Sequence, residues 1–159
     1  MVRILSFGIL AIFALGAQSV QLPIQETQDV AVPAEIPAEV IAVENIADFL
    51  SENPGLEVVE LKAEQRAQIR RYTLGQRVSG DRLQAVSRGS FTWPTLHNAA
   101  ATVRFSGAIV SHVRVTVQQT SNLGRVYTIS GGIGQRAIAF VIEARSTKQF
   151  IFTAEIFGR

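Results

Sequence analysis

The sequence predicts an all-β fold, a small antiparallel β-sandwich of about seven or eight short strands, and three observations support this. Apolar and polar residues alternate with a period of two from Tyr72 onward, as in Val113 to Gln118, which is typical of half-buried strands. Turn residues such as Ser79-Gly80-Asp81 separate these runs. The chain of 159 residues has no cysteine, so a continuous apolar core must hold the domain together without disulfides.

The N-terminus, residues 1–19, has the layout of a secretory signal peptide. Arg3 supplies a positive charge, an apolar run extends from Ile4 to Leu15, and Ala17 and Ser19 are small residues before a cleavage at Val20. The alternative is an uncleaved membrane anchor, but these apolar residues would reach only ~18 Å across a hydrocarbon core of ~30 Å. We therefore expect a secreted, extracellular protein.

Residues 20–60 form an acidic arm with nine acidic residues and no Lys or Arg. Its first part, to about Pro37, is proline-punctuated and predicts an extended linker. A short amphipathic helix is expected over 38–52, because apolar side chains recur there at helical spacing before Asn53-Pro54-Gly55 ends the pattern. A transient helix in a disordered arm is the alternative.

Residues 61–71 read as a basic connector that ends in Arg70-Arg71. From residue 61 to the C-terminus the chain has fourteen basic residues and four acidic ones. The acidic arm could screen its own basic domain by self-association, serve a different partner, or be a pro-segment. The dibasic pair Arg70-Arg71 is a candidate processing site, as is Ser19, with two solvated arginines as the alternative.

The β-sandwich domain is expected over residues 72–159, and its strands follow from the alternating runs. Turn signals divide the region at Trp93-Pro94, at the Gly131–Gly134 cluster and at Ser146-Thr147-Lys148. The candidate strands lie near residues 72–78, 82–87, 90–93, 100–106, 109–119, 125–130, 136–145 and 149–157.

The glycine cluster resembles a dinucleotide-binding loop, because Gly132 to Ala137 matches the spacing G-x-G-x-x-G/A. That motif requires a helix after the last small residue, whereas Ala137 opens a run that alternates like a strand. We therefore expect a strand connection in which glycine supplies positive φ, and no cofactor.

The sequence contains few residues that could form a catalytic or metal-binding site. His97 and His112 are the two histidines, and without cysteine they make a poor zinc set. Ser111, His112 and Asp81 could be drawn as a triad, but no nucleophile motif surrounds Ser111. The sequence therefore predicts no catalytic, cofactor or metal site and no enzyme, and a hydrolase reading would require both histidines to converge with Asp81.

Arginines recur about once per strand, and a shared solvent face would give an anion-binding surface for a protein, a glycan or another anionic surface. Ordinary solvated positions are the alternative, and nucleic acid is not expected as a partner. Phe91 and Trp93 read either as a ligand platform or as a core plug. The arginines assigned to this surface are Arg77, Arg82, Arg104, Arg114, Arg125, Arg136 and Arg145.

Three segments in order, LGQRVSGDRL, YTISGGIGQ and FIFTAEIFGR, resemble the insect multiprotein bridging factor 2 family, which includes response-to-pathogen proteins. The resemblance covers about residues 72–159. It implies a small β domain without known catalytic residues. The positions that match the family motif read as structural turns: Gly80, Asp81, Gly131, Gly132, Gly134 and Gly158.

The family resemblance implies two different roles. One is a transcriptional coactivator that bridges a sequence-specific factor to the basal machinery, for which the acidic arm would suit an activation segment. The other is a secreted protein of gut, saliva or haemolymph linked to immune or feeding responses. Because residues 1–19 read as a signal peptide, the expectation is a secreted, non-enzymatic binding protein, with the coactivator as the alternative.

Overall fold

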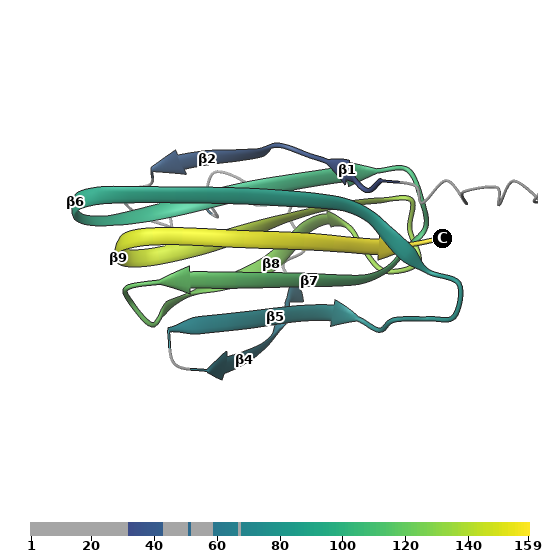
Figure 1. Ribbon diagram of the computed structural model, residues 1–159, viewed down its shortest axis with the longest axis horizontal. Coiled ribbons are helices and arrows are strands. Elements are labelled where there is room, and N and C mark those ends of the chain that lie inside the picture. Colours follow the sequence, from purple (N-terminus) through teal and green to yellow (C-terminus); the bar gives the residue numbers. More distant parts are fainter. Residues whose placement is uncertain (1–31, 43–50, 52–58, 67) are drawn as a thin grey trace, which may run out of the picture. The chain divides into compact units, whose positions relative to one another are not determined.

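The computed structural model describes residues 32–42, 51, 59–66 and 68–159, all within one compact unit, Val32–Arg159 (Figure 1). The expected signal peptide, 1–19, lies outside these residues. The described residues are mostly β-strand, as predicted, and they form nine strands. These are β1 (Ala34–Glu35), β2 (Ala38–Ala42), β3 (Val59–Glu60), β4 (Lys62–Arg66), β5 (Ile69–Gly75), β6 (Arg82–Ser106), β7 (Val110–Gln119), β8 (Leu123–Gly131) and β9 (Ala137–Gly158).

The strands join into one mixed sheet rather than a purely antiparallel one. The main order is β1-β6-β9-β7-β5-β4, with β2 paired to β6 and β8 paired to both β9 and β3. β1 runs parallel to β6, and the remaining pairs are antiparallel. The pairs formed within residues 72–159 are antiparallel, as expected. The parallel pair comes from β1, a two-residue strand between Pro33 and Pro37, in the part of the arm that was expected to be an extended linker.

Two strands are much longer than the short strands that the turn signals predicted. β6 has 25 residues and β9 has 22, so the segments expected at 82–87, 90–93 and 100–106 belong to a single strand. At Trp93-Pro94 the strand bulges instead of ending. Thr92 pairs with Gln149 and His97 with Thr147, so four residues of β6 lie opposite one of β9.

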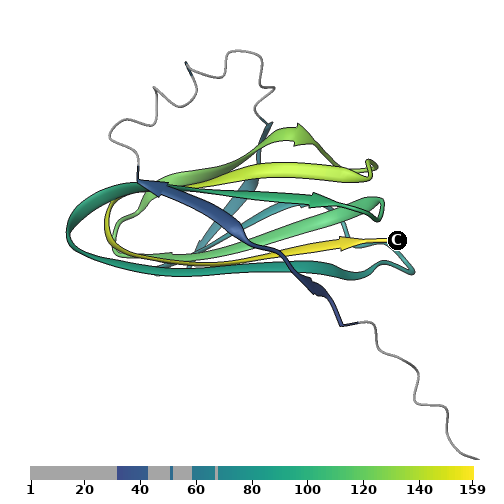
Figure 2. The same cartoon turned by 90° about the horizontal axis from the view of Figure 1, so that it is seen from above.

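Both long strands turn back on themselves near this bulge, the teal and yellow ribbons of Figure 2. Ser146 of β9 has φ of 50°, the one positive value recorded for a non-glycine residue in the described chain. The bulge and this residue bend the strand pair, because extra and left-handed residues change the local direction of the backbone. Turn residues thus mark a bend within paired strands, which sequence alone cannot distinguish from a strand end.

The bend divides the sheet into two halves that share one apolar core. The later part of β9 pairs with β7, while its earlier part pairs with β8. We call the half with β7 the first half and the half with β8 the second half. One cluster of fully buried side chains joins them, with Val115 and Phe152 from the first half and Phe140 and Ile142 from the second. Every second residue of these strands therefore faces the core, and the residues between them face outward.

The outward face of the second half is also buried in part. A smaller cluster joins residues of β6, β8 and β9 whose side chains point away from the main core. The run from Ile138 to Ala144 is consequently buried on both sides, and Glu143 lies within it. The members of this cluster are Ala100, Tyr127, Ile129, Ala139 and Val141.

The acidic arm and connector contain strands where other structure was expected. Ala38–Ala42 is β2, so the helix proposed over 38–52 was wrong at its start, while 43–50 and 52–58 lie outside the described residues. Ala38 and Val40 pack against the core and Glu39 is exposed, a period of two rather than 3.6. The expected basic connector, 61–71, contains β4 and the beginning of β5. No helix in the described part of the chain has the length and apolar character to span a bilayer.

Candidate functional site

A buried carboxylate, Glu143 on β9, organises the most unusual group of side chains in the described residues. Its side chain is 1% exposed. Its Oε2 accepts a hydrogen bond from Nε of Arg125 at 3.0 Å and another from Nη2 of Arg145 at 3.1 Å. Arg125 reaches it because β8 and β9 pair with these two residues in register. A carboxylate so buried needs such partners, since an unpaired buried charge is very costly.

Tyr127 completes this group, which we call the Glu143 cluster (Arg125, Tyr127, Glu143 and Arg145). The guanidinium of Arg125 lies 5.0 Å from the centroid of the Tyr127 ring. Burial, with the nearby Glu143 carboxylate, raises the pKa of Tyr127 above its ordinary value, so the phenol stays protonated. The hydrogen bond to Glu143 raises the pKa of Arg125, so its positive charge is permanent. Arg125 and Tyr127 are thus held in their protonated forms by the surrounding residues.

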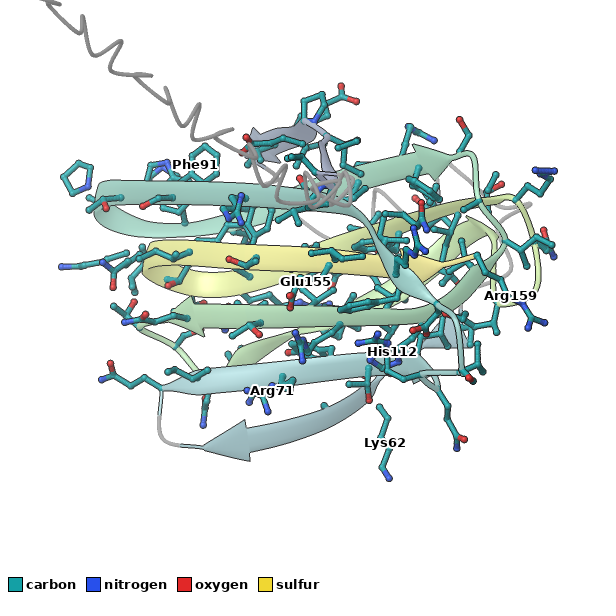
Figure 3. All side chains as sticks on the ribbon, turned by 45° about the vertical axis from the view of Figure 1, so that its right-hand side comes forward. Lys62, Arg71, Phe91, His112, Glu155 and Arg159 are labelled. Carbon is teal, nitrogen blue, oxygen red and sulfur yellow. The ribbon has the colours of Figure 1, made fainter. Side chains whose placement is uncertain are left out.

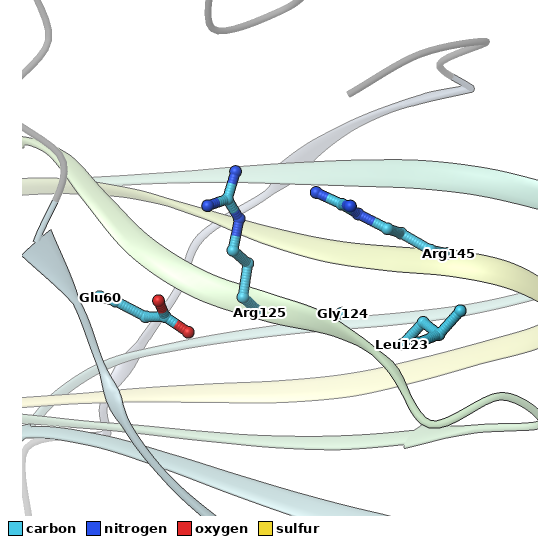
Figure 4. A pocket seen from close by; sticks show the side chains of 5 residues that line it. All are labelled: Glu60, Leu123, Gly124, Arg125 and Arg145. Carbon is cyan, nitrogen blue, oxygen red and sulfur yellow. The ribbon is translucent and has the colours of Figure 1, made fainter. Parts of the chain in front are cut away.

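A pocket of about 300 Å³ opens beside this cluster (Figure 4). Arg125 and Arg145 line it, and Figure 4 shows the Arg145 side chain extending toward Arg125. Leu123, Gly124 and Glu60 complete the lining. In the described residues, the buried Nε of Arg145, which belongs to a residue that lines the pocket, has no hydrogen-bond partner. The Tyr127 hydroxyl and Oε1 of Glu143 are also buried, and a hydrogen bond to Glu143 contributes to the raised pKa of Tyr127. Unpartnered buried polar atoms are uncommon in native proteins, so this pocket is the principal candidate site.

A second ion pair lies on the outward face of the other half of the sheet. Arg114 donates from Nε and Nη2 to the two carboxylate oxygens of Glu155, at 2.6 and 2.8 Å. β7 and β9 hold these residues directly opposite each other. The hydrogen bonding between them, with a smaller contribution from the opposite charges, raises the pKa of Arg114 and lowers that of Glu155. Arg71 and Lys62 extend this face across β5 and β4 (Figure 3).

Asp81 lies in the turn before β6, where hydrogen bonds hold its side chain in place. It accepts hydrogen bonds from Arg77 Nε at 2.7 Å, from the backbone of Val78 at 3.0 Å and from Ser111 Oγ at 2.8 Å. The hydrogen bond from Arg77 is the main reason that the pKa of Asp81 lies far below its ordinary value. Arg77 also lies 4.0 Å from the ring centroid of Phe157. These contacts assign Asp81 a structural role in the turn.

The seven arginines of the expected anion-binding surface do not gather on one face. Arg77, Arg114, Arg125 and Arg145 each pair with a carboxylate. Arg136 is exposed and donates to the carbonyl of Gly107, and Arg82 and Arg104 are exposed on β6. The structure therefore groups Arg125 and Arg145 in a pocket and scatters the others.

The histidines lie on different strands, His97 on β6 and His112 on β7, and they pair with distant residues of β9. His97 pairs with Thr147 and stacks on Trp93, with ring centroids 5.4 Å apart. His112 pairs with Phe157, ten residues further along the strand, or about 33 Å. The hydrolase reading required both to converge with Asp81, and the structure does not bring them together. Ser111 instead bonds Asp81 directly, with no histidine between them.

Phe91 and Trp93 support the core. Their rings stack with centroids 6.1 Å apart, and both residues pack against the main apolar cluster. Phe91 continues the stack to the buried Phe150, at 6.4 Å. This arrangement matches a core plug rather than a ligand platform.

The glycine cluster joins β8 to β9 and holds no dinucleotide-binding helix, since Ala137 begins a strand. Gly131 has φ of 69°, and a Cβ there would collide with the carbonyl of Ala137. Gly134 has φ of 82° and donates its N–H to Val110 at 2.8 Å. Among the other motif positions, Gly80 lies in the turn with Asp81, Gly132 lies in the loop, and Gly158 is packed against Ile109 near the C-terminus.

The dibasic pair lies within β5, which pairs with β4 on one side and β7 on the other. Arg70 also donates to the backbone carbonyls of Gly124 and Asn122. A protease needs its substrate as a separate extended strand, so cleavage after Arg71 would require β5 to leave the sheet. Ser19, the other candidate processing residue, lies outside the described residues.

The family model described as transcription activator MBF2 matches residues 74–158, from the end of β5 through β9. This is more than half of the chain. The chain belongs to the MBF2 family. The match confirms the resemblance given by the three sequence segments. No curated protein and no solved structure matches the chain.

Family membership corrects two of our expectations. We expected a secreted binding protein of gut, saliva or immune responses, and we placed it outside the cell. The matched family is one of transcription activators, which fits the coactivator alternative and a nuclear or cytoplasmic location. The secreted reading gave most weight to residues 1–19, whereas the MBF2 match rests on residues 74–158.

Sequence reasoning also missed the central residue of the site. The alternation of the candidate strand 136–145 indicates only that Glu143 faces outward, away from Ile142 and Ala144. A signal was present, because Glu143 is the sole charged residue between Ala137 and Ala144, in a run otherwise apolar. A charge inside such a run requires a partner, and the arginines of neighbouring strands are the natural candidates.

Proposed function

We propose that this MBF2-family protein is a transcriptional coactivator that bridges a sequence-specific factor to the basal machinery. The observation that carries the proposal is the match of a transcription-activator family to residues 74–158. These residues contribute the long strands β6 and β9 and most of the buried core. The family region is thus the part of the chain that supplies a rigid scaffold.

A bridging protein needs two surfaces that two partners can occupy at once. We propose that the two halves of the sheet act as the two layers of a small sandwich. The Glu143 cluster would then lie on one outer face and the Arg114–Glu155 pair on the other, because both alternate with residues of the shared core. Each face presents arginines held by a carboxylate, which favours binding of polar or acidic protein segments.

We propose further that the protein acts by binding alone, without catalysis or a cofactor. Asp81 is already bonded by three donors, and the two histidines are too far apart to share a substrate atom. Acidic residues of the arm, from Glu26 to Glu60, provide the composition of an activation segment.

A reporter assay tests the coactivator function. The full chain would be co-expressed with a sequence-specific activator of the same cell type, and transcription from a promoter with that activator's sites would be measured. The expected result is an increase that requires both the activator and its sites. Equal output with and without the chain, at matched expression, would reject the coactivator function.

A further inference from the structure

We infer that the arginine pocket (Glu60, Leu123, Gly124, Arg125 and Arg145) binds a carboxylate side chain of an acidic segment in a partner protein. This inference rests on the proposed coactivator function, and it names the chemistry of one partner.

The pocket presents donors that have no acceptor in the described residues. Arg125 donates to Glu143 from Nε, so the two terminal nitrogens of its guanidinium can still donate hydrogen bonds to a ligand. Arg145 donates from Nη2 to Glu143, and its Nε is buried and therefore not a donor that a ligand can reach. A carboxylate can accept two parallel hydrogen bonds from one guanidinium, so it fits the terminal nitrogens of Arg125.

The donors are held in place before any ligand arrives. Arg125 is fixed on one side by the buried Glu143 and on another by the ring of Tyr127, 5.0 Å away. Arg145 is fixed by the same carboxylate oxygen. Long side chains usually lose rotamer freedom on binding, and prior fixation removes most of this cost. Glu143 is itself 1% exposed, so a ligand in the pocket meets the guanidinium groups and not the carboxylate beneath them.

The rest of the lining favours an acidic side chain next to an apolar one. Leu123 is 53% exposed at the pocket, so the lining offers an apolar surface beside the two arginines. Glu60 is the one carboxylate that lines the pocket, and it would repel an anionic ligand. A segment in which Asp or Glu alternates with Leu would satisfy the arginines and cover Leu123, whereas a free phosphate would leave Leu123 uncovered.

Fluorescence anisotropy with the full chain tests this assignment. The probe is a labelled eight-residue peptide of alternating Asp and Leu, with an Asn/Leu peptide as its control. We expect the Asp/Leu peptide to bind and R125Q/R145Q to weaken it by at least about tenfold, because charge-assisted hydrogen bonds are lost. The matched variant R104Q/R136Q, which removes the same charge elsewhere, should change the affinity less than about twofold.

The variant E60Q gives an independent test in the opposite direction. It removes the repelling carboxylate without touching the arginines, so peptide affinity should rise by about twofold to fivefold. If R125Q/R145Q fails to fold, peptide titration of the wild-type chain followed by NMR replaces it. The Nε–Hε signals of Arg125 and Arg145 should then shift more than those of Arg104 and Arg136.

Several results would overturn the inference. Equal losses in R125Q/R145Q and R104Q/R136Q would show general charge attraction, and equal binding of both peptides would show that the carboxylate is not recognised. If wild type binds no peptide but the variant E26Q/D29N does, the pocket belongs to the chain's own acidic arm and not to a partner. Peptide binding without reporter activation would reject the coactivator function and keep the pocket, and the reverse result would reject the pocket alone.

Discussion

Removing one arginine from the Glu143 cluster should destabilise the protein more than removing the glutamate. R125M deletes one of two hydrogen-bond donors to a carboxylate that is 1% exposed and cannot turn to water. Breaking a buried pair in this way costs about 3–5 kcal/mol when no partner remains, and Arg145 remains here. Loss of the stacking on Tyr127 adds about 0.5–1 kcal/mol. We therefore expect a net loss of about 2–3 kcal/mol in the free energy of unfolding.

The glutamate variant E143L should lose less stability than R125M, because both arginines can reach water once Glu143 is gone. Their side chains are 30% and 43% exposed, so each can rotate toward solvent once the carboxylate is gone. We expect E143L, and the double variant R125M/E143L, to lie within about 1 kcal/mol of wild type.

Urea denaturation of the full chain, followed by the fluorescence of its single tryptophan, measures all three variants. Trp93 packs against the main core and therefore reports its unfolding. A loss for R125M below about 0.5 kcal/mol, or a larger loss for E143L than for R125M, would refute the reasoning that Glu143 is a trapped charge.

Three further predictions concern the scaffold. Because its partners hold the pKa of Asp81 below the ordinary value, its contribution to stability is present above about pH 4 and is lost as the pH falls. D81N should therefore show a shallower decline in urea stability between pH 7 and pH 2 than wild type. G131A should cost about 2–3 kcal/mol, since its Cβ meets the Ala137 carbonyl at positive φ, whereas G134A has open space and should cost only about 1 kcal/mol; thermal unfolding ranks the two. F152A removes a fully buried ring and should cost about 3–5 kcal/mol by the same urea assay. Equal losses in G131A and G134A, or a decline for D81N as steep as that of wild type, would contradict these assignments.

The strand-rich region was predictable because its signal is local. Val113, Val115 and Val117 alternate with polar residues, and they are buried in the core as that period requires. The glycine cluster was also read correctly as a strand connection, since the residues after it favour strand over helix.

The long strands were not predictable, because bends and strand ends use the same residues. Trp93-Pro94 is a bulge, and a proline at a bulge need not donate to the ladder. The two halves of β6 and β9 are continuous only because they remain paired around the bend. Nothing in the local sequence specifies that pairing.

The candidate site depends on the register between strands, and the local sequence pattern does not specify that register. Arg125 meets Glu143, and Arg114 meets Glu155, only because β9 pairs with β8 along one half and with β7 along the other. The sequence predicted arginines on strands, but it could not tell which of them would find a carboxylate.

The most direct test of the coactivator account is to locate the full chain in cells and identify what it binds there. A C-terminally tagged chain would be expressed at low level, nuclei and culture medium would be separated, and the chain would be purified from each. The account predicts a nuclear pool of the chain that co-purifies with a general transcription factor. Recovery of the chain from the medium alone, with no transcription factor bound, would contradict it.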